Sequence, residues 1–384
     1  MKCNWKECTL GDLITFQRGH DLPKSQMING KYPVVGSNGI IGYHNEYTTE
    51  APSITIGRSG NVGNPYIVYG RTWSHNTTLY VKDFKGNDPV FVYYFLKTMD
   101  LANYAGGSAV PTLNRNHIHT LPIEVPESVG VQKKIGYYLR LFDEKIELNN
   151  EINNNLEQQA QAIFKSWFVD FEPFGGVQPP EMKFVPLQEL CKVVTKGTTP
   201  TTLGKPFTSS GINFIKAESI LDSHSIDSSK FAFIDEETNA LLKRSIIKAN
   251  DIVFTIAGTL GRFAMVDNSV LPANTNQAVA IIRPDENKVT PAYLYSFFIG
   301  NWHNEYYSKR IQQAVQANLS LTTIKSLPIA VLSNTTMNDY DELVSPLFAL
   351  MKGNEEENRR LSELRDTLLP KLMSGELDVS NIEL

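Results

Sequence analysis

Residues 132–171, QKKIGYYLRLFDEKIELNNEINNNLEQQAQAIFKSWFVDF, decide the fold of this chain. Alternating steps of four and three residues through this stretch meet apolar side chains at eight of ten positions. A 4-3 spacing held over several heptads is the seam of a coiled coil. The ten positions are Ile135, Leu139, Phe142, Ile146, Asn149, Asn153, Leu156, Ala160, Ile163 and Trp167.

A second stretch near the end of the chain repeats this seam, with seven of ten positions apolar. Its positions are Tyr340, Val344, Leu347, Met351, Asn354, Asn358, Leu361, Arg365, Leu368 and Leu372. Two ordinary amphipathic helices, each packed on its own domain, are the alternative, but they would hardly carry polar interruptions at the same two heptad positions. We therefore predict two matched coiled-coil helices, each a spacer of defined length.

The polar interruptions predict how the two helices would pair. Four residues, which we call the seam asparagines, are Asn149, Asn153, Asn354 and Asn358. If the helices pack antiparallel about their midpoints, Asn149 faces Asn358 and Asn153 faces Asn354. A buried layer of asparagines costs stability but fixes the register, because any slip would bury amides without partners.

The rest of the chain is duplicated as well. Three phrases of the first half return in the second, namely Leu121-Pro122-Ile123 as Leu327-Pro328-Ile329, Thr55-Ile56-Gly57 as Thr255-Ile256-Ala257, and residues 89–95 as 291–297. The period of about 200 residues exceeds that of solenoid repeats and equals a domain plus an arm. We expect such a chain to bind another molecule at two separate points.

Strand-like runs mixed with a few helices, without regular βαβ alternation, indicate the α+β class. We expect two tandem α/β domains and two long helices, related by a pseudo-two-fold internal repeat. The predicted parts are residues 1–131 (first domain), 132–171 (first helix), 172–183 (linker), 184–336 (second domain), 337–374 (second helix) and 375–384 (tail).

The composition places the chain in a broad class. Its three cysteines, Cys3, Cys8 and Cys191, form neither a disulfide framework nor a CxxC metal pair, which suits a reducing compartment. There is no signal peptide and no apolar run long enough to span a membrane. We expect a cytoplasmic protein without a membrane partner.

The net charge of −5 at first argues against a nucleic-acid partner. Residues 1–125, however, hold 11 Lys and Arg against 9 Asp and Glu, and residues 183–331 hold 15 against 12. The arms and the tail carry the acidic excess. Local charge sets the field that a phosphate backbone meets, so the two domains could bind nucleic acid. Chance alone could also produce such small excesses.

The sequence gives little support to an enzyme. It has no phosphate-binding GxxxxGK[ST] loop, no HExxH, no GxSxG and no cysteine–histidine zinc pattern. His117 and His119 lie close together but have no third ligand nearby, so we predict no metal site. The glycine-rich residues 57–63 are either a plain turn or a turn whose Arg58 and backbone amides touch DNA.

Polar loops are the candidates for DNA contact, because Arg and Lys pair with guanine edges and Asn and Gln with adenine. The same residue types are common in any solvated loop. The candidates in the first domain are Arg58, Ser59, Arg71, Ser74, His75, Asn76, Thr112, Asn114 and Arg115. Those in the second are Lys196, Thr198, Thr199, Arg262, Asn274, Asn276, Gln277, Lys309, Arg310, Gln312 and Gln313.

With both arms in view, the chain resembles a specificity subunit of a type I restriction–modification system. Residues 132–171 resemble the central conserved region of that family, and residues 363–377, ELRDTLLPKLMSGEL, resemble its C-terminal conserved region. The two Leu-Pro-Ile phrases fit as well. The two helices differ at their first residues. The first begins with Gln132-Lys133-Lys134-Ile135, whereas the equivalent residues of the second are Met337-Asn338-Asp339-Tyr340, so the two helix ends need not contact partner subunits equally.

The resemblance implies two target-recognition domains held apart by two antiparallel helices, each domain reading one half of a bipartite, asymmetric site in double-stranded DNA. It implies no catalytic residues and no cofactor in this chain. Two modification subunits would bind S-adenosylmethionine and methylate adenine N6, and two restriction subunits, which use ATP and Mg, can join them. A scaffold that links two protein partners without DNA is the alternative, and a fused enzyme is a third reading.

Overall fold

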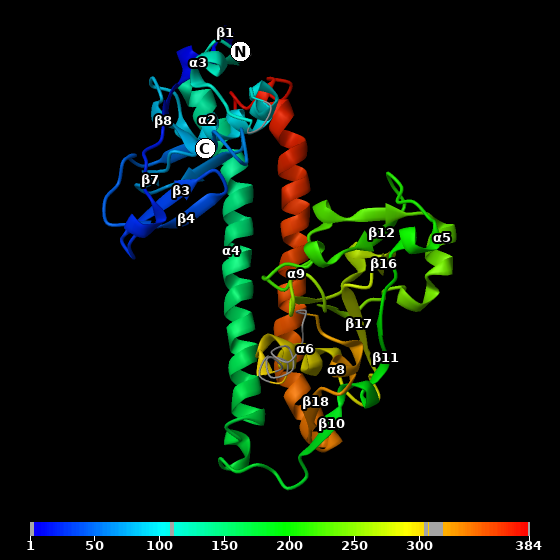
Figure 1. Cartoon of the computed structure of the whole chain (residues 1–384). Coiled ribbons are helices and arrows are strands. Elements are labelled where there is room, and N and C mark those ends of the chain that lie inside the picture. The colour runs from blue at the N-terminus through cyan, green and yellow to red at the C-terminus, as the bar shows by residue number, and fades with distance from the viewer. Residues whose placement is uncertain (1–3, 108–110, 303–305, 307–317, 383–384) are drawn as a thin grey trace. The chain divides into compact units, whose positions relative to one another are not determined.

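The computed structural model describes residues 4–107, 111–302, 306 and 318–382. The chain divides into two compact units, residues 1–149 with 356–384, and residues 150–355, which we call the first and the second unit (Figure 1). Among the described residues, no helix combines the length and the apolar character needed to cross a membrane.

An antiparallel sheet forms the centre of the first unit. Its strands, in spatial order, are β2 (Thr15–Arg18), β8 (Thr78–Asp83), β5 (Ser53–Gly57) and β6 (Pro65–Val68). Alternate residues of the strands point to one face, where Ile54, Ile56 and Leu79 join the core with the helix α2 (Pro89–Thr98). Pro89 occupies the first turn of that helix and the Asp88 side chain caps it.

Smaller elements complete the first unit. A three-stranded sheet has the order β4 (Gly39–His44), β3 (Tyr32–Gly36) and β7 (Trp73–Ser74), with β3 and β7 parallel. A strand pair consists of β1 (Trp5–Thr9) and β9 (Pro122–Pro126). The short helices are α1 (Leu10–Leu13) and α3 (Arg115–His119).

The second unit repeats this plan. Its main sheet has the order β11 (Cys191–Lys196), β17 (Val279–Pro284), β14 (Ile252–Thr255) and β15 (Phe263–Met265). The remaining strands are β13 (Ala232–Ile234), β12 (Ile212–Ile215), β16 (Ala273–Thr275), β10 (Lys183–Pro186) and β18 (Pro328–Val331). Its short helices, among the described residues, are α5 (Glu236–Leu241), α6 (Pro291–Ile299) and α8 (Leu321–Lys325). The predicted α+β class and the internal repeat are confirmed.

One predicted correspondence between the halves is wrong by two residues. In the main sheets Gly57 lies opposite Thr78, and Thr255 lies opposite Val279. An equivalent hydrogen bond closes the turn after each strand. The Gly63 amide donates to the Gly57 carbonyl, and the Gly261 amide donates to the Thr255 carbonyl. Gly57 therefore matches Thr255 and not Ala257. A strand has a side-chain period of two, so this shift leaves the inward and outward faces unchanged and the sequence pattern cannot reveal it.

The two predicted seams lie on α4 (Val129–Phe168) and α9 (Asn334–Met373), helices of 40 residues each. None of the twenty seam positions is exposed. Within the first unit Asp143 contacts Arg365 while Asn149 contacts Asn358, so the contact partner on α9 moves back along the chain as α4 advances. The helices are therefore antiparallel there, and the coiled coil is confirmed.

Candidate nucleic-acid interface

Three loops of the first unit meet at one end of its main sheet. Arg18 ends β2 opposite Leu79, and Gly57 ends β5 opposite Thr78, the first residue of β8. The segments after Arg18, after Gly57 and before Thr78 therefore leave the sheet at the same edge. Residues 112–115 join them, because the Leu113 amide donates to the Arg58 carbonyl at 2.9 Å.

We call residues 19–21, 58–61, 75–77 and 112–115 the first loop cluster. Its members are tied together by hydrogen bonds: the Arg58 amide donates to the Thr77 carbonyl at 2.8 Å, and Arg58 Nη1 donates to the Asn76 carbonyl at 3.0 Å. Ser59 and Thr112 form a β-bridge. Most of the predicted contact residues of the first domain therefore converge here, namely Arg58, Ser59, His75, Asn76, Thr112, Asn114 and Arg115.

The second unit has an equivalent cluster, residues 197–199, 256–261, 275–278 and 318–320, which we call the second loop cluster. Lys196 ends β11 opposite Ala280, and Thr255 ends β14 opposite Val279. The Leu319 amide donates to the Ile256 carbonyl at 2.9 Å, which repeats the bond from Leu113 to Arg58. The predicted residues Thr198, Thr199, Asn276 and Gln277 lie in this cluster, directly after or close to Lys196.

A glycine permits the close packing of each cluster. A Cβ at Gly19 would lie 2.1 Å from the His75 carbonyl oxygen, and one at Gly197 would lie 1.8 Å from that of Thr275. Backbone atoms cannot move aside as the end of a flexible side chain can. Gly19 and Gly197 are therefore required for the loops to approach one another.

A cation precedes this glycine in both units, and only the one in the second unit was among the sequence-predicted site residues. The strand registers make Arg18 of β2 and Lys196 of β11 equivalent, since their partners Leu79 and Ala280 each follow the first residue of the next strand. The Arg18 side chain is 53% exposed, and Lys196 is exposed. Lys196 was predicted but Arg18 was not, although the repeated basic residue followed by glycine is a sequence signal that could have identified it.

Arg244 is a further cation that the sequence did not single out. Its Nη2 donates to the Lys196 carbonyl and to Thr198 Oγ1, both at 3.3 Å. This arginine comes from the short turn after α5 and adds positive charge beside the second loop cluster. No local sequence pattern places it there, because its approach depends on the tertiary fold.

Several predicted contact residues lie outside the two loop clusters. Ser74 and Asn274 are fully buried, Ser74 beside Thr49 and Asn274 beside Ser245, so we leave both out of the interface. Arg71 pairs with Glu50, and Arg262 forms two hydrogen bonds with the Asp222 carboxylate. Lys309, Arg310, Gln312 and Gln313 lie outside the described residues.

His119 stabilises the fold of the first unit through a hydrogen bond to the backbone. Its Nε2 accepts a hydrogen bond from the Phe16 amide at 3.0 Å, and burial lowers the pKa of the imidazole, which favours the neutral acceptor form. Over the part of the chain that the structure describes, no three His, Cys, Asp or Glu side chains are grouped so that they could hold a metal ion.

The seam asparagines form direct hydrogen bonds in the two pairs that the antiparallel arrangement predicts. In the first unit, Nδ2 of the fully buried Asn149 donates to Asn358 and to Glu357, each at 2.8 Å. In the second unit, Asn354 donates to Asn153 at 2.7 Å. Whether these contacts fix the register stays a prediction.

Comparisons with known proteins agree with this duplicated architecture. A family model described as the type I restriction modification DNA specificity domain matches residues 2–158 and 179–332. The chain is 26% identical over 311 residues to the type I restriction enzyme MjaIX specificity subunit of Methanocaldococcus jannaschii, covering 76% of this chain and 70% of that protein. It is 25% identical over 368 residues to the HindI specificity subunit of Haemophilus influenzae, covering 75% and 77% respectively.

A solved structure shares the fold. The S subunit of a type I restriction–modification system from M. genitalium superposes with a TM-score of 0.60 at 18% identity, covering 96% of each chain. At this identity the likeness concerns the fold alone, and it extends over both units and both long helices.

Proposed function

The chain belongs to the family of the type I restriction modification DNA specificity domain, and we propose that each of its two loop clusters contacts one half of a bipartite, asymmetric site in double-stranded DNA. In this role it is the DNA sequence-specificity subunit of a type I restriction–modification system. We propose which surfaces of the chain contact DNA and how the chain works with its partner subunits.

The equivalence of Arg18 and Lys196 is the observation that carries the proposal. A cation that stands at the same register position in two diverged domains, beside a glycine-packed loop cluster, suits a phosphate of the DNA backbone. The neighbouring polar side chains supply donors and acceptors of the kind that read base edges, such as Asn76 in the first cluster and Gln277 in the second.

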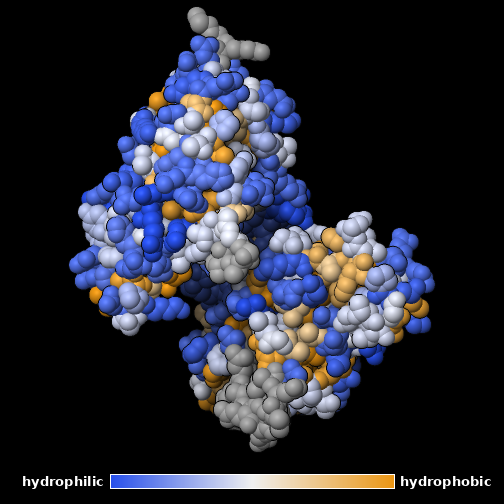
Figure 2. All heavy atoms as spheres, turned by 45° about the horizontal axis from the view of Figure 1, so that its top comes forward, coloured by the Kyte–Doolittle hydropathy of each residue, from blue (hydrophilic) through white to orange (hydrophobic). Residues whose placement is uncertain are grey.

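We further propose that α4 and α9 set the number of base pairs between the two half-sites and dock two modification subunits. Large apolar side chains are exposed on both helices in both units, including Leu141 and Leu148 of the first unit and Leu343 and Leu350 of the second. Exposed apolar side chains of this size commonly mark protein interfaces. Apolar patches lie among polar ones on the face drawn in Figure 2.

The chemistry would then reside in the partners. We propose that the modification subunits bind S-adenosylmethionine and methylate adenine N6, and that two restriction subunits, where they join, use ATP and Mg. The specificity chain would contribute recognition and geometry, with no catalytic residue and no cofactor of its own.

Sequencing of N6-methyladenine in genomic DNA tests the proposal. Cells that carry this chain with its modification partner should methylate adenines within one bipartite motif, and deletion of the gene for this chain should remove that motif. A methylation pattern that is unchanged by the deletion would contradict the proposed function.

A further inference from the structure

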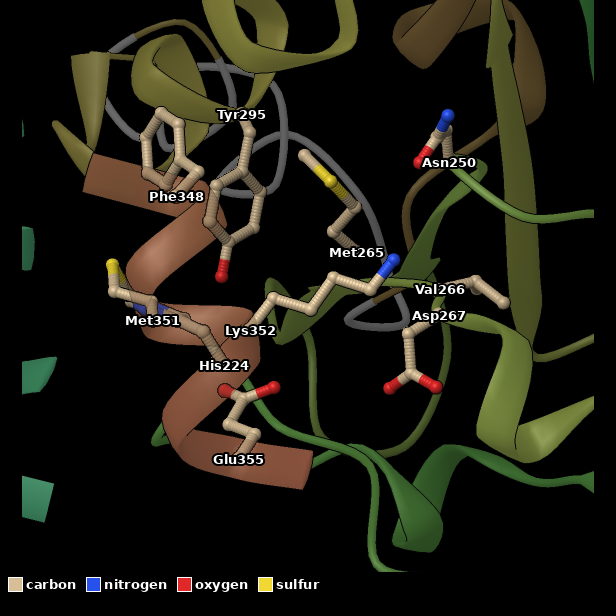
Figure 3. A pocket seen from close by; sticks show the side chains of 10 residues that line it. All are labelled: His224, Asn250, Met265, Val266, Asp267, Tyr295, Phe348, Met351, Lys352 and Glu355. Atoms are coloured by element: carbon tan, nitrogen blue, oxygen red, sulfur yellow. The ribbon is translucent and has the colours of Figure 1, made fainter. Parts of the chain in front are cut away.

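A cavity with a volume of about 70 Å³ lies in the second unit, between one face of α9 and the domain packed against that face. Phe348, Lys352 and Glu355 face it from successive turns of α9. Tyr295 of α6 and Asp267, which follows β15, face it from the domain (Figure 3). A single water molecule needs about 10 to 15 Å³ of such volume, so the cavity can hold a small group of a few non-hydrogen atoms.

One wall of the cavity is aromatic and apolar. The rings of Tyr295 and Phe348 meet edge to face with their centroids 5.2 Å apart. Met351, which is 8% exposed, continues this wall along α9. Such a wall suits a flat or short apolar group, and aromatic faces also attract cations.

The hydroxyl of Tyr295 is directed into the cavity (Figure 3). The side chain is only 6% exposed, yet its hydroxyl makes no hydrogen bond to any residue that the structure describes. Burial raises the pKa of this phenol, so it stays neutral and can donate or accept. A buried hydroxyl without a protein partner is a position where a ligand atom gains a hydrogen bond.

Two carboxylates accompany this hydroxyl. Glu355 lies exposed at the mouth of the cavity, and Asp267 lines it from the domain. Neither forms an ion pair within the described ranges. Desolvation and the charge of Asp267 raise the pKa of Glu355 to about 7, and Lys352 offsets this only in part. The two carboxylates therefore carry more negative charge than Lys352 offsets.

We propose that this cavity binds a small organic ammonium ion that carries an aromatic or short aliphatic body. The ammonium group would pair with Glu355 and Asp267 and donate to the Tyr295 hydroxyl, while the body would lie against Phe348 and Met351. A single positive charge fits best, because Lys352 already offsets part of the negative charge of the two carboxylates. An organic cation is favoured over a metal ion, because these described residues do not form a metal-binding group.

Calorimetric titration of the full-length chain with benzylammonium chloride tests this site, with benzyl alcohol as the neutral probe of the same shape. We expect benzylammonium to bind and benzyl alcohol not to bind. Glu355→Gln should weaken binding about tenfold or more, since it removes a charge-assisted contact. Tyr295→Phe should weaken it by a smaller factor. Glu342→Gln, which removes an exposed carboxylate elsewhere on α9, should leave it unchanged.

The pH dependence gives a second readout. Glu355 is ionised above its pKa of about 7, so benzylammonium should bind more tightly as the pH rises from about 6 to about 8. The other titratable groups that line the same cavities as Glu355 are Asp267, Lys352, His224, Tyr295, Glu157 and Asp222. Glu355→Gln should flatten this dependence.

Three results would overturn the proposal. One is equal binding of benzyl alcohol and benzylammonium, and another is undiminished binding by a folded Glu355→Gln variant. The third is the absence of any binding heat with the folded parent chain. Circular dichroism of each variant establishes that it is folded, and Tyr295→Phe provides an independent test should Glu355→Gln fail to fold.

Discussion

Neutralising Arg18 and Lys196 should weaken DNA binding in a way that depends on salt. Arg18→Gln and Lys196→Gln each remove one charge at equivalent strand ends. Neutralising one phosphate contributes about 0.9 to the slope of log affinity against log salt, which at about 0.15 M salt corresponds to roughly fivefold in affinity, or ~1 kcal/mol. The double variant should therefore lose about twice that slope and roughly 30-fold in affinity.

These losses should not reflect unfolding. Arg18 lies 3.6 Å from Asp21, and both side chains are more than half exposed. Surface ion pairs of this kind contribute only about 0 to 1 kcal/mol to stability. The folding of Arg18→Gln should accordingly match that of the parent chain within measurement error.

Fluorescence anisotropy of labelled duplex DNA, titrated with the chain and its modification partner between about 50 and about 200 mM salt, measures both quantities. Lys82→Gln and Lys192→Gln are matched controls, because these exposed lysines lie toward the opposite ends of β8 and β11 from the loop clusters. An unchanged slope in the double variant, or an equal loss in the controls, would refute the assignment of the loop clusters.

Three further predictions concern the helices and the second unit. Changing the four seam asparagines to Leu should raise the thermal unfolding midpoint while loosening register or oligomeric state, as buried apolar side chains associate well but specify poorly; a strongly destabilised variant would argue against their pairing in the seam. Asp251→Asn should destabilise the second unit by ~3–5 kcal/mol, because it breaks a fully buried carboxylate's ion pair with Arg283. Hydrogen exchange should then accelerate in β14 and β17 but not in β2 and β8, and uniform acceleration would contradict independent units. Adding one heptad to each long helix extends it by about 10 Å, so methylation should move to the same half-sequences with a spacer about three base pairs longer. An active variant that kept its original spacer would show that the helices are not a ruler.

The features that could be predicted from the sequence are those set by local periodicity and local caps. The seam positions follow from a heptad spacing, and their burial in the structure needs no tertiary information beyond that pattern. Pro89 and Pro291 each lie in the first turn of a helix behind a capping residue, which is a local signal that a sequence carries. The repeated Leu-Pro-Ile phrases both introduce a strand that pairs with the first strand of its domain.

The loop clusters were harder to predict, because residue type does not tell how a polar group is used. Asn274 has the chemistry to read adenine, but the fold buries it and its side chain is bonded within the protein. Arg262 is similarly held by Asp222. Arg244 reaches the second loop cluster only through tertiary packing, so no local sequence pattern indicates its contact there.

The residue correspondence between the two halves could also be predicted only in part from the sequence. The two-residue error at Gly57 and Thr255 arose because strands repeat every two residues. The equivalence of Arg18 and Lys196 was hidden because the loops that follow these strands differ in length between the halves. The strand registers in the structure corrected the first error and established the second equivalence, at which the basic residue followed by glycine was the one local signal.

Exchange of one recognition domain tests the central claim most directly. Residues 1–125 would be replaced by the equivalent domain of a relative, and N6-methyladenine would be mapped by sequencing in cells that express the chimera with the modification partner. We expect one half of the recognised motif to change while the other half is retained, because each loop cluster belongs to its own unit. A change in both halves, or the loss of methylation by a well-folded chimera, would contradict two independent readers on one chain.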